Sequence, residues 1–367
     1  MIKVWDPGVR LFHWLLVVAA SVSLWTGFLG PRNLLNLHLA AGTAVAALLC
    51  FRLIWGCLGS TYARFSSFLF GPAAALGYAK QLARGRHPRY LGHNPLGSVM
   101  IFALMATLAA LAMSGVVALG GALKQGPLAF ATPFALGRSS LALHRYAAYA
   151  LAALICGHLL GVIFETVVGD AGLVAAMISG RKKAKAHDIQ AVAAKARPLP
   201  AAIVLLLALS AASYAIVAGS KRPALGVPAE PLAPDYVREC GGCHMPYPPS
   251  LGTKARWTAL MADLTDHFGE DASLEPTVKA GILEYLSDNS AEKWDTKAAR
   301  EFAPPNPDDP RRITATLAWR KAHRGVAEVV FKSKAVRSKS ACNACHGDAT
   351  TGRFDPQNIH VPEAASP

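Results

Sequence analysis

Two short motifs in the last third of the chain contain residues suited to redox chemistry. The C-x-x-C-H spacing lets two cysteine thiols form thioether bonds to one haem, while the adjacent histidine supplies an axial imidazole. A structural disulfide or a zinc site is the alternative, but two copies in a chain with seven cysteines favour two covalent haems c. The motifs read Cys240-Gly-Gly-Cys243-His244 and Cys342-Asn-Ala-Cys345-His346. The other cysteines lie in or beside apolar stretches and are expected to be packing residues: Cys50, Cys57 and Cys156.

Each haem c also needs a sixth ligand or leaves that position empty. Met245 directly follows its own axial histidine and cannot reach the far face of the same haem. His267 ends an amphipathic stretch over 256–266, and His323 ends another over 313–323. The spacing suits local pairing with the two motif histidines, but it leaves open which haem each one serves. Met261 and His360 are the remaining candidates for a sixth ligand. His360 lies in a terminal tail and is expected to be solvated.

Five apolar runs in the first 220 residues are each long enough to cross a membrane. A hydrocarbon core of about 30 Å takes roughly 20 helical residues, and buried core helices are the less favoured alternative. The first run could instead be a cleaved signal peptide, but it lacks a small-x-small cleavage site and is expected to be retained. The predicted spans are 11–29, 34–55, 96–120, 141–168 and 199–218.

Charge orients these spans. The net charge of +14 lies entirely in residues 1–220, because the remainder of the chain has equal numbers of basic and acidic residues. Fourteen of the eighteen basic residues in this apolar part fall on one side of the predicted spans. The positive-inside rule then places the N-terminus in the cytoplasm and the C-terminal part outside, so nucleic acid is not needed to explain the charge. The four basic residues on the outer side are Arg32, Lys124, Arg138 and Arg145.

Four histidines lie within the predicted spans, where ionisable residues usually mark function. His144 and His158 are 14 residues apart on one helix face, which separates them by about 21 Å along the axis. With the N-terminus inside, His13 matches His158 in depth and His38 matches His144. Two bis-histidine sites stacked in a helix bundle are what two b-type haems require, because each iron takes one axial imidazole per face.

Small residues and one arginine accompany these histidines. Gly42, Gly157 and Gly161 lie near the predicted ligands and either clear room for porphyrins or allow close helix packing. Arg145 follows His144 and is a candidate partner for a haem propionate, with a plain interfacial arginine as the alternative.

Four motifs are spread over the first 180 residues: VRLFHW at 9–14, FRLIWG at 51–56, YLGHNPLG at 90–97 and HRYAAY…GHLLG at 144–161. With them, this region resembles the bacterial cytochrome b561 family, which includes the cytochrome b subunits of nickel–iron hydrogenases. This resemblance implies two haems b and exchange of electrons with membrane quinone. His93 matches the family's GHNP element but precedes the third span, so it is expected to be structural or near a quinone or proton path.

Four motifs follow in the last third of the chain: YVRECGGCHMPYPPSL at 236–251, WTALMADLTDHFGEDASL at 257–274, RITATLAWRKAHR at 312–324 and SACNACHG at 340–347. With them, residues 235–367 resemble the di-haem cytochrome c family known as DHC. The resemblance implies two covalent haems with bis-histidine ligation by His244, His267, His323 and His346, and electron transfer to a small soluble haem protein.

The sequence therefore predicts an all-α membrane protein with five parts. They are a four-helix di-haem b bundle (1–180), a basic cytoplasmic loop (181–198), a fifth transmembrane helix (199–218), a proline-rich tether (219–234) and a small, mainly helical periplasmic di-haem cytochrome c domain (235–367).

The predicted function is electron transfer in the bacterial inner membrane. Electrons pass from quinol through two haems b and two haems c to a soluble periplasmic haem protein, as in a quinol:cytochrome c-type oxidoreductase or an electron-transfer component. No acid–base or nucleophile constellation is evident in the sequence, so proton chemistry is assigned to a quinone site, placed near His13. A hydrogenase-like anchor subunit, a superoxide:quinone oxidoreductase and a ligand sensor or peroxidase are the alternatives. A homodimer or larger redox complex stays open.

Overall fold

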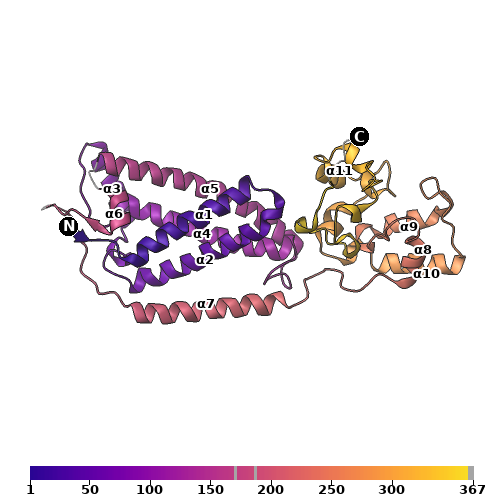
Figure 1. Cartoon of the computed structure of the whole chain (residues 1–367), viewed down its shortest axis with the longest axis horizontal. Coiled ribbons are helices and arrows are strands. Elements are labelled where there is room, and N and C mark those ends of the chain that lie inside the picture. The colour runs from indigo at the N-terminus through magenta and orange to yellow at the C-terminus, as the bar shows by residue number, and fades with distance from the viewer. Residues whose placement is uncertain (169–171, 186–187, 363–367) are drawn as a thin grey trace. The chain divides into compact units, whose positions relative to one another are not determined.

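The computed structural model of the chain describes residues 1–168, 172–185 and 188–362 (Figure 1). The described residues form helices and helical turns, with strands limited to two residues each, so the predicted all-α class is confirmed. They divide into two compact units. The first holds 1–116 and 140–218, and the second holds 117–139 and 219–367. Residues 169–171 of the predicted bundle, 186–187 of the predicted basic loop and 363–367 of the predicted cytochrome c domain lie outside the described residues.

Among the described residues that precede position 200, seven helices begin. Five are long and apolar enough to cross a membrane: α1, α2, α4, α5 and α7. These correspond to the five predicted spans, although α5 begins seven residues before the expected position 141. The helices are α1 (Pro7–Phe28), α2 (Leu35–Leu58), α3 (Pro72–Ala83), α4 (Pro95–Ala122), α5 (Phe134–Val167), α6 (Leu173–Ser179) and α7 (Pro198–Ser220).

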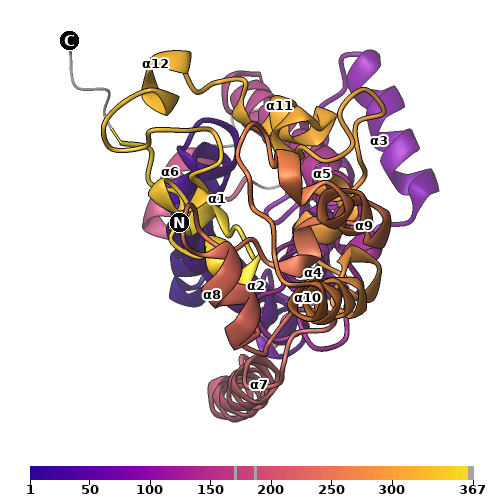
Figure 2. The ribbon, with the colours of Figure 1, turned by 90° about the vertical axis from the view of Figure 1, so that its right-hand side faces the viewer.

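The core of the first unit is formed by α1, α2, α4 and α5, which lie side by side in Figure 1. Val45 and Leu49 of α2 pack with Leu108 of α4 and Leu151 of α5, and α1 contributes Leu16. Helix α7 runs along the margin of this unit in Figures 1 and 2, and its apolar side chains are mostly exposed. Exposed apolar faces are expected on helices whose solvent is lipid.

The N-terminus is fixed by a carboxylate and a short strand pair. Asp6 caps α1 by accepting a hydrogen bond from the Val9 amide at 2.9 Å. The same carboxylate accepts bonds from Trp55 Nε1 at 3.0 Å and Ser60 Oγ at 2.5 Å. Strand β1 (Ile2–Lys3) pairs antiparallel with β2 (Arg181–Lys182), so the start of the chain lies against the segment that follows the fourth long helix.

The C-terminal part of the second unit has short helices joined by irregular segments. One core forms where α8 and α9 pack on α10, around Tyr236, Trp257, Met261 and Ile282 (Figure 2). A second, smaller core lies around α12. The helices are α8 (Pro234–Cys240), α9 (Lys254–Ala262), α10 (Pro276–Asp288), α11 (Leu317–His323) and α12 (Glu328–Phe331). Single 3-10 turns include Leu264–Asp266, Ile313–Ala315 and Cys342–Ala344, and Ala298–Phe302 forms a π turn.

The segment between α7 and α8 has no regular structure, as expected for a tether, but it is anchored. The Leu225 amide donates a hydrogen bond to the Ala129 carbonyl at 2.9 Å. The Arg222 guanidinium lies 4.5 Å from the centre of the Phe130 ring. Both partners belong to the loop between α4 and α5, which is part of the same compact unit.

Candidate haem-binding sites

The structure brings two membrane histidines, His38 of α2 and His144 of α5, together as predicted. The centres of the two rings are 6.1 Å apart. Two imidazoles that bind one metal from opposite sides, with metal–nitrogen bonds of about 2 Å, place their ring centres about 6 Å apart. The separation therefore fits two axial ligands of one haem iron.

Neighbouring helices orient both of these rings. His38 Nδ1 lies 3.1 Å from the Ser23 carbonyl oxygen, and His144 Nδ1 lies 3.0 Å from the Leu111 carbonyl oxygen. Because a carbonyl only accepts, each Nδ1 must carry the proton, which leaves Nε2 free for a metal. Two hydroxyl groups add support: Thr26 Oγ1 at 2.9 Å from His38 Nδ1, and Ser114 Oγ at 3.2 Å from His144 Nδ1.

These supporting groups were not identified from the sequence. Their only sequence signal is a hydroxyl residue in an apolar helix, and many such residues merely bond their own backbone. Two glycines were also missed. A Cβ atom on Gly27 would lie 3.3 Å from His38 Cε1, and one on Gly115 would lie 3.2 Å from His144 Cε1. Glycine at both positions lets each ring lie close to a helix backbone.

The glycines singled out in the sequence fall into two groups. A Cβ atom on Gly42 or Gly161 would meet no atom within 4 Å, so open space adjoins both residues. This space is what a porphyrin beside the helices would need. A Cβ atom on Gly157 would lie 3.3 Å from the Met100 side chain. Gly157 therefore allows close packing between α5 and α4.

His13 and His158 form the second predicted membrane pair. The two rings are close enough to interact electrostatically, and they come from α1 and α5. The buried Nδ1 atom of His13 has no hydrogen-bond partner among the described residues. Ligation by this pair is a prediction supported by proximity, without the ring-to-ring geometry that His38 and His144 provide.

Two more histidine pairs lie in the second unit. The ring centres of His244 and His267 are 6.2 Å apart, and those of His323 and His346 are 6.0 Å apart. Both separations match that of the membrane pair and fit two imidazoles on one iron. The structure thus pairs each motif histidine with its nearer distal candidate, a choice that sequence spacing left open.

A backbone carbonyl fixes the tautomer of one histidine in each pair. His244 Nδ1 lies 2.8 Å from the Met245 carbonyl oxygen, and His323 Nδ1 lies 2.9 Å from the Trp319 carbonyl oxygen. Burial lowers the pKa of His267, His323 and His346 below the usual value of 6.5. Neutral imidazoles with free Nε2 atoms are the form in which histidine binds iron.

The cysteines of both motifs are available for covalent attachment. All seven cysteines of the chain are free, so neither motif forms a disulfide. Burial raises the pKa of the Cys240 and Cys342 thiols to about 11. Tyr247 connects the two motifs, because its ring lies 5.0 Å from that of His244 and its hydroxyl donates to the Ser340 carbonyl at 2.7 Å.

Three other candidates are not members of the histidine pairs, although the His360 amide donates to the Cys345 carbonyl at 2.8 Å. Met261 is 1 % exposed and belongs to the core between α9 and α10, so it serves packing. His360 is exposed, as expected for a residue in the tail. Arg145 is exposed on α5, and its role toward a propionate stays a prediction.

A polar cluster that the sequence did not reveal surrounds Glu165, near the end of α5. Tyr78 Oη donates to Glu165 Oε1 at 3.0 Å, and Asn94 Nδ2 donates to the same oxygen at 2.6 Å. Burial, followed by the charge of Glu165, raises the pKa of Tyr78. His93 packs between the rings of Trp5 and Phe68, at 4.7 and 4.5 Å, in the same part of the first unit.

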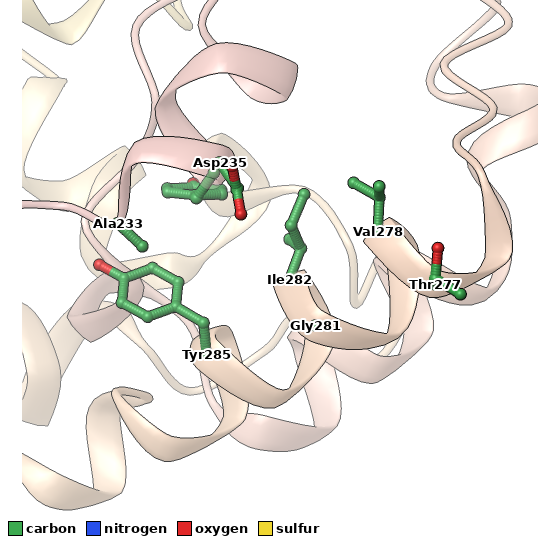
Figure 3. A pocket seen from close by; sticks show the side chains of 8 residues that line it. Ala233, Asp235, Thr277, Val278, Gly281, Ile282 and Tyr285 are labelled. Atoms are coloured by element: carbon green, nitrogen blue, oxygen red, sulfur yellow. The ribbon is translucent and has the colours of Figure 1, made fainter.

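A cavity of about 330 Å³ lies between α8 and α10 (Figure 3). In Figure 3, Ile282 and Tyr285 of α10 face Ala233 and Asp235. None of the eight predicted ligands lines this cavity, so it is separate from the histidine pairs. Its walls are Ala233, Asp235, Tyr236, Thr277, Val278, Gly281, Ile282 and Tyr285.

Comparisons with known proteins agree with this division. The family model for prokaryotic cytochrome b561 matches residues 4–180, and that for dihaem cytochrome c matches residues 236–354. A dihaem cytochrome c structure from Shewanella baltica OS155 is 34 % identical, covering 35 % of this chain and 93 % of that chain, with a TM-score of 0.29. A dihaem cytochrome c structure from Rhodobacter sphaeroides is 38 % identical. The match covers 32 % of this chain and 93 % of that chain, with a TM-score of 0.28.

No curated protein matches the chain. The two family models together cover both sets of histidine pairs and both C-x-x-C-H motifs. The chain is a membrane haem protein of electron transfer that belongs to the prokaryotic cytochrome b561 family over residues 4–180 and to the dihaem cytochrome c family over residues 236–354.

Proposed function

We propose that this protein oxidises membrane quinol and delivers the electrons to a soluble haem protein outside the bacterial inner membrane. The observation that carries the proposal is the recurrence of one geometry, three histidine pairs with ring centres 6.0–6.2 Å apart. Bound haem would supply one-electron chemistry at each pair. The protein itself holds the imidazoles in place, and paired histidines leave no open position for oxygen or substrate.

The four membrane histidines support a path across the bilayer. His144 and His158 lie on one helix and are about 21 Å apart along its axis. The pair His13 and His158 would receive electrons from quinol, and the pair His38 and His144 would pass them outward. Fourteen of eighteen basic residues on the His13 side support a cytoplasmic N-terminus, which places the C-x-x-C-H motifs outside.

Oxidation of one quinol yields two electrons, passed on singly, and two protons, so a proton acceptor is needed at the quinol site. We assign this role to Glu165, seven residues after His158 on α5 and therefore about 10 Å further along the same helix face. Tyr78 and Asn94 hold its carboxylate in place through Oε1. A quinol bound at this end of the first unit would release its protons to the cytoplasmic side.

A quantitative haem spectrum of the purified full-length protein tests the cofactor content. The pyridine haemochrome should give haem b and haem c in a two-to-two ratio. One haem b, or none, would overturn the assignment of the membrane pairs. Anaerobic mixing with a short-chain quinol should then reduce both types of haem. Co-purification of a metal-containing partner would instead favour a hydrogenase-like anchor, and superoxide-driven quinone reduction would favour a superoxide oxidoreductase.

Replacement of the carboxylate tests the proton acceptor. Glu165→Gln should slow quinol-driven haem reduction at least tenfold while haem content stays the same, because an amide cannot take up a proton. Asp188→Asn is the matched control, since Asp188 is another described acidic residue near this end and pairs with Arg89 at 3.5 Å. Equal rates in the two variants would contradict the assignment of Glu165.

A further inference from the structure

The loop between α4 and α5 is a tightly built part of the second unit. Helices α4 and α5 approach closely at its base, where a Cβ atom on Gly137 would lie 2.4 Å from Gly121 Cα. Lys124, just after the end of α4, has a positive φ of 54°, which is uncommon for a residue with a side chain. The loop is therefore held in one conformation rather than being a passive connection.

A buried ion pair joins this loop to the cytochrome c part of the chain. The Lys124 ammonium lies 2.7 Å from Asp295 Oδ2 and also donates to the Thr132 carbonyl at 3.0 Å. The Lys124 side chain is 4 % exposed, so loss of its partner would leave a buried charge. Asp295 Oδ2 also accepts from the Phe134 amide at 2.7 Å, and Phe134 is the first residue of α5. One carboxylate thus neutralises the lysine and caps a helix.

The tether is fixed to the same carboxylate residue. The Asp295 amide donates to the Gly226 carbonyl at 2.8 Å. Gly226 has a φ of +64°, and a Cβ atom there would lie 2.5 Å from Asp295 Cβ, so this close approach requires glycine. Residues 219–227, 123–134 and 295 therefore form one locked structure, which we call the latch.

The latch lies beside one histidine pair. Arg353 donates from Nη2 to the Lys124 carbonyl at 3.3 Å, and the next residue, Phe354, has its ring 5.1 Å from that of His346. A cavity of about 50 Å³ has Leu123, Lys124, Arg353 and Phe354 among its lining residues. The loop thus reaches the surroundings of the His323 and His346 pair. Tyr247 connects the two haem c sites, because its hydroxyl donates to the Ser340 carbonyl, two residues before Cys342, and its ring lies beside that of His244.

We propose that Lys124 and Asp295 are positioning residues that hold the His323 and His346 site against the α4–α5 loop, so that this site receives electrons first. The His244 and His267 site receives them second and delivers them outside. Each transfer oxidises one haem and reduces the next by one electron, and no proton is needed. This order rests on the proposed function, because it assumes that electrons arrive from the b-type pairs.

Two substitutions of the latch test the positioning role in the full-length protein. Lys124→Met removes the charge at similar length, and Asp295→Asn keeps the shape but not the charge. Amide hydrogen exchange of segments 130–136 and 222–227 should become at least tenfold faster, while the haem c content is unchanged. Reduction of haem c after anaerobic mixing with quinol should become at least tenfold slower. Lys339→Met is the control, because Lys339 and Glu328 form an exposed pair at 2.8 Å in the same unit.

Unchanged exchange, or faster exchange with unchanged haem c reduction, would overturn the positioning role. If quinol failed to reduce even the wild-type protein, the proposed function would be wrong. Hydrogen exchange would still decide whether Lys124 and Asp295 lock the loop: faster exchange would support the latch, and unchanged exchange would overturn it. The two proposals therefore fail in distinguishable ways.

The order of the two sites has its own test. His323→Ala should slow the reduction of both haems c, whereas His267→Ala should slow only the second. Carbon monoxide, which binds a reduced haem that has lost an axial ligand, identifies the altered site in each variant. The reverse pattern, with His267→Ala slowing both, would overturn the proposed order.

Discussion

The two units place three histidine pairs at the same spacing, one in the membrane unit and two in the cytochrome c part, by different means. In the membrane unit, four histidines lie on long helices, and carbonyls of neighbouring helices orient the His38 and His144 rings. In the cytochrome c part, the histidines lie at or just after the ends of short helices and turns, so little regular structure positions them. The membrane unit has a continuous helical frame because lipid forces each span to satisfy its own backbone hydrogen bonds.

This difference indicates how much each region depends on its cofactor. The cytochrome c part has separate apolar cores around Tyr236 and Val330, joined by short helices and irregular segments. Two covalent porphyrins would supply much of the missing core. The membrane helices form their own frame, so loss of a haem there should cost less structure. The predictions below test this contrast.

The largest effect is expected from removal of one covalent attachment. Cys342→Ser with Cys345→Ser should halve the haem c content and make the cytochrome c part readily degraded by protease, because the smaller core around Phe331 and Val336 would lose its porphyrin. The haem b content should stay the same. Haemochrome spectra and limited proteolysis measure both effects, with Cys57→Ser, at an exposed free cysteine, as the control. A protease-resistant variant with one haem c would contradict the contrast.

Removal of one membrane ligand should have a smaller structural effect. His158→Ala should halve the haem b content and leave both haems c attached, because the long helix α5 persists without the metal. Far-ultraviolet circular dichroism should show little loss of helix. His360→Ala, at an exposed histidine in the tail, is the control. An unchanged haem b content would show that the pairing of His13 with His158 is wrong.

Loss of a supporting hydroxyl should weaken a site without emptying it. Thr26→Val removes the 2.9 Å contact to His38 Nδ1 but keeps the Ser23 carbonyl contact. Groups that orient a metal-bound histidine typically contribute tenfold or more to metal affinity, so haem b should dissociate about tenfold faster. Transfer of haem to an apoprotein acceptor measures this rate. Thr43→Val is the matched control, because the Thr43 hydroxyl donates to the Leu39 carbonyl of its own helix. If haem b dissociated equally fast from both variants, Thr26 would have no special role in holding His38.

The smallest effect concerns a histidine outside the pairs. Burial, and then the charges of Arg52, Lys182 and His158, lower the pKa of His93 from 6.5 to about 3. The unfolded chain therefore binds more protons than the folded protein between these values, so stability is complete above pH 6.5 and falls as the pH is lowered. At pH 5 the loss is about 2 kcal/mol. Thermal unfolding in detergent at pH 7 and pH 5 should show this loss in wild type and not in His93→Phe, and equal pH dependence would exclude His93 as its origin.

The fold could be predicted from the sequence because its main signals are local. Runs of apolar residues predict spans, and their basic flanks predict an orientation. The meeting of His38 and His144 followed from helix rise and from span order alone. Ligation itself, and the orientation of the protein in the membrane, stay predictions.

The supporting contacts could not be predicted because they join distant parts of the chain. Lys124 meets Asp295 across 171 residues, and the sequence identified Lys124 only as a basic residue on the outer side. The early start of α5 has the same origin, because Asp295 caps Phe134 from far along the chain. Glu165 meets Tyr78 across 87 residues, and neither residue has a distinctive neighbourhood in the sequence.

The pairing of β1 with β2 has a consequence for biosynthesis. Ile2 meets Lys182, so β1 cannot pair until the chain has been made as far as residue 182. Four long helices must enter the membrane before this contact can form, whereas α7 and the cytochrome c part follow later. Strand β1 thus completes the first unit only after β2 has been made, and ribosome-bound chains that end before residue 180 should leave Ile2 and Lys3 open to protease.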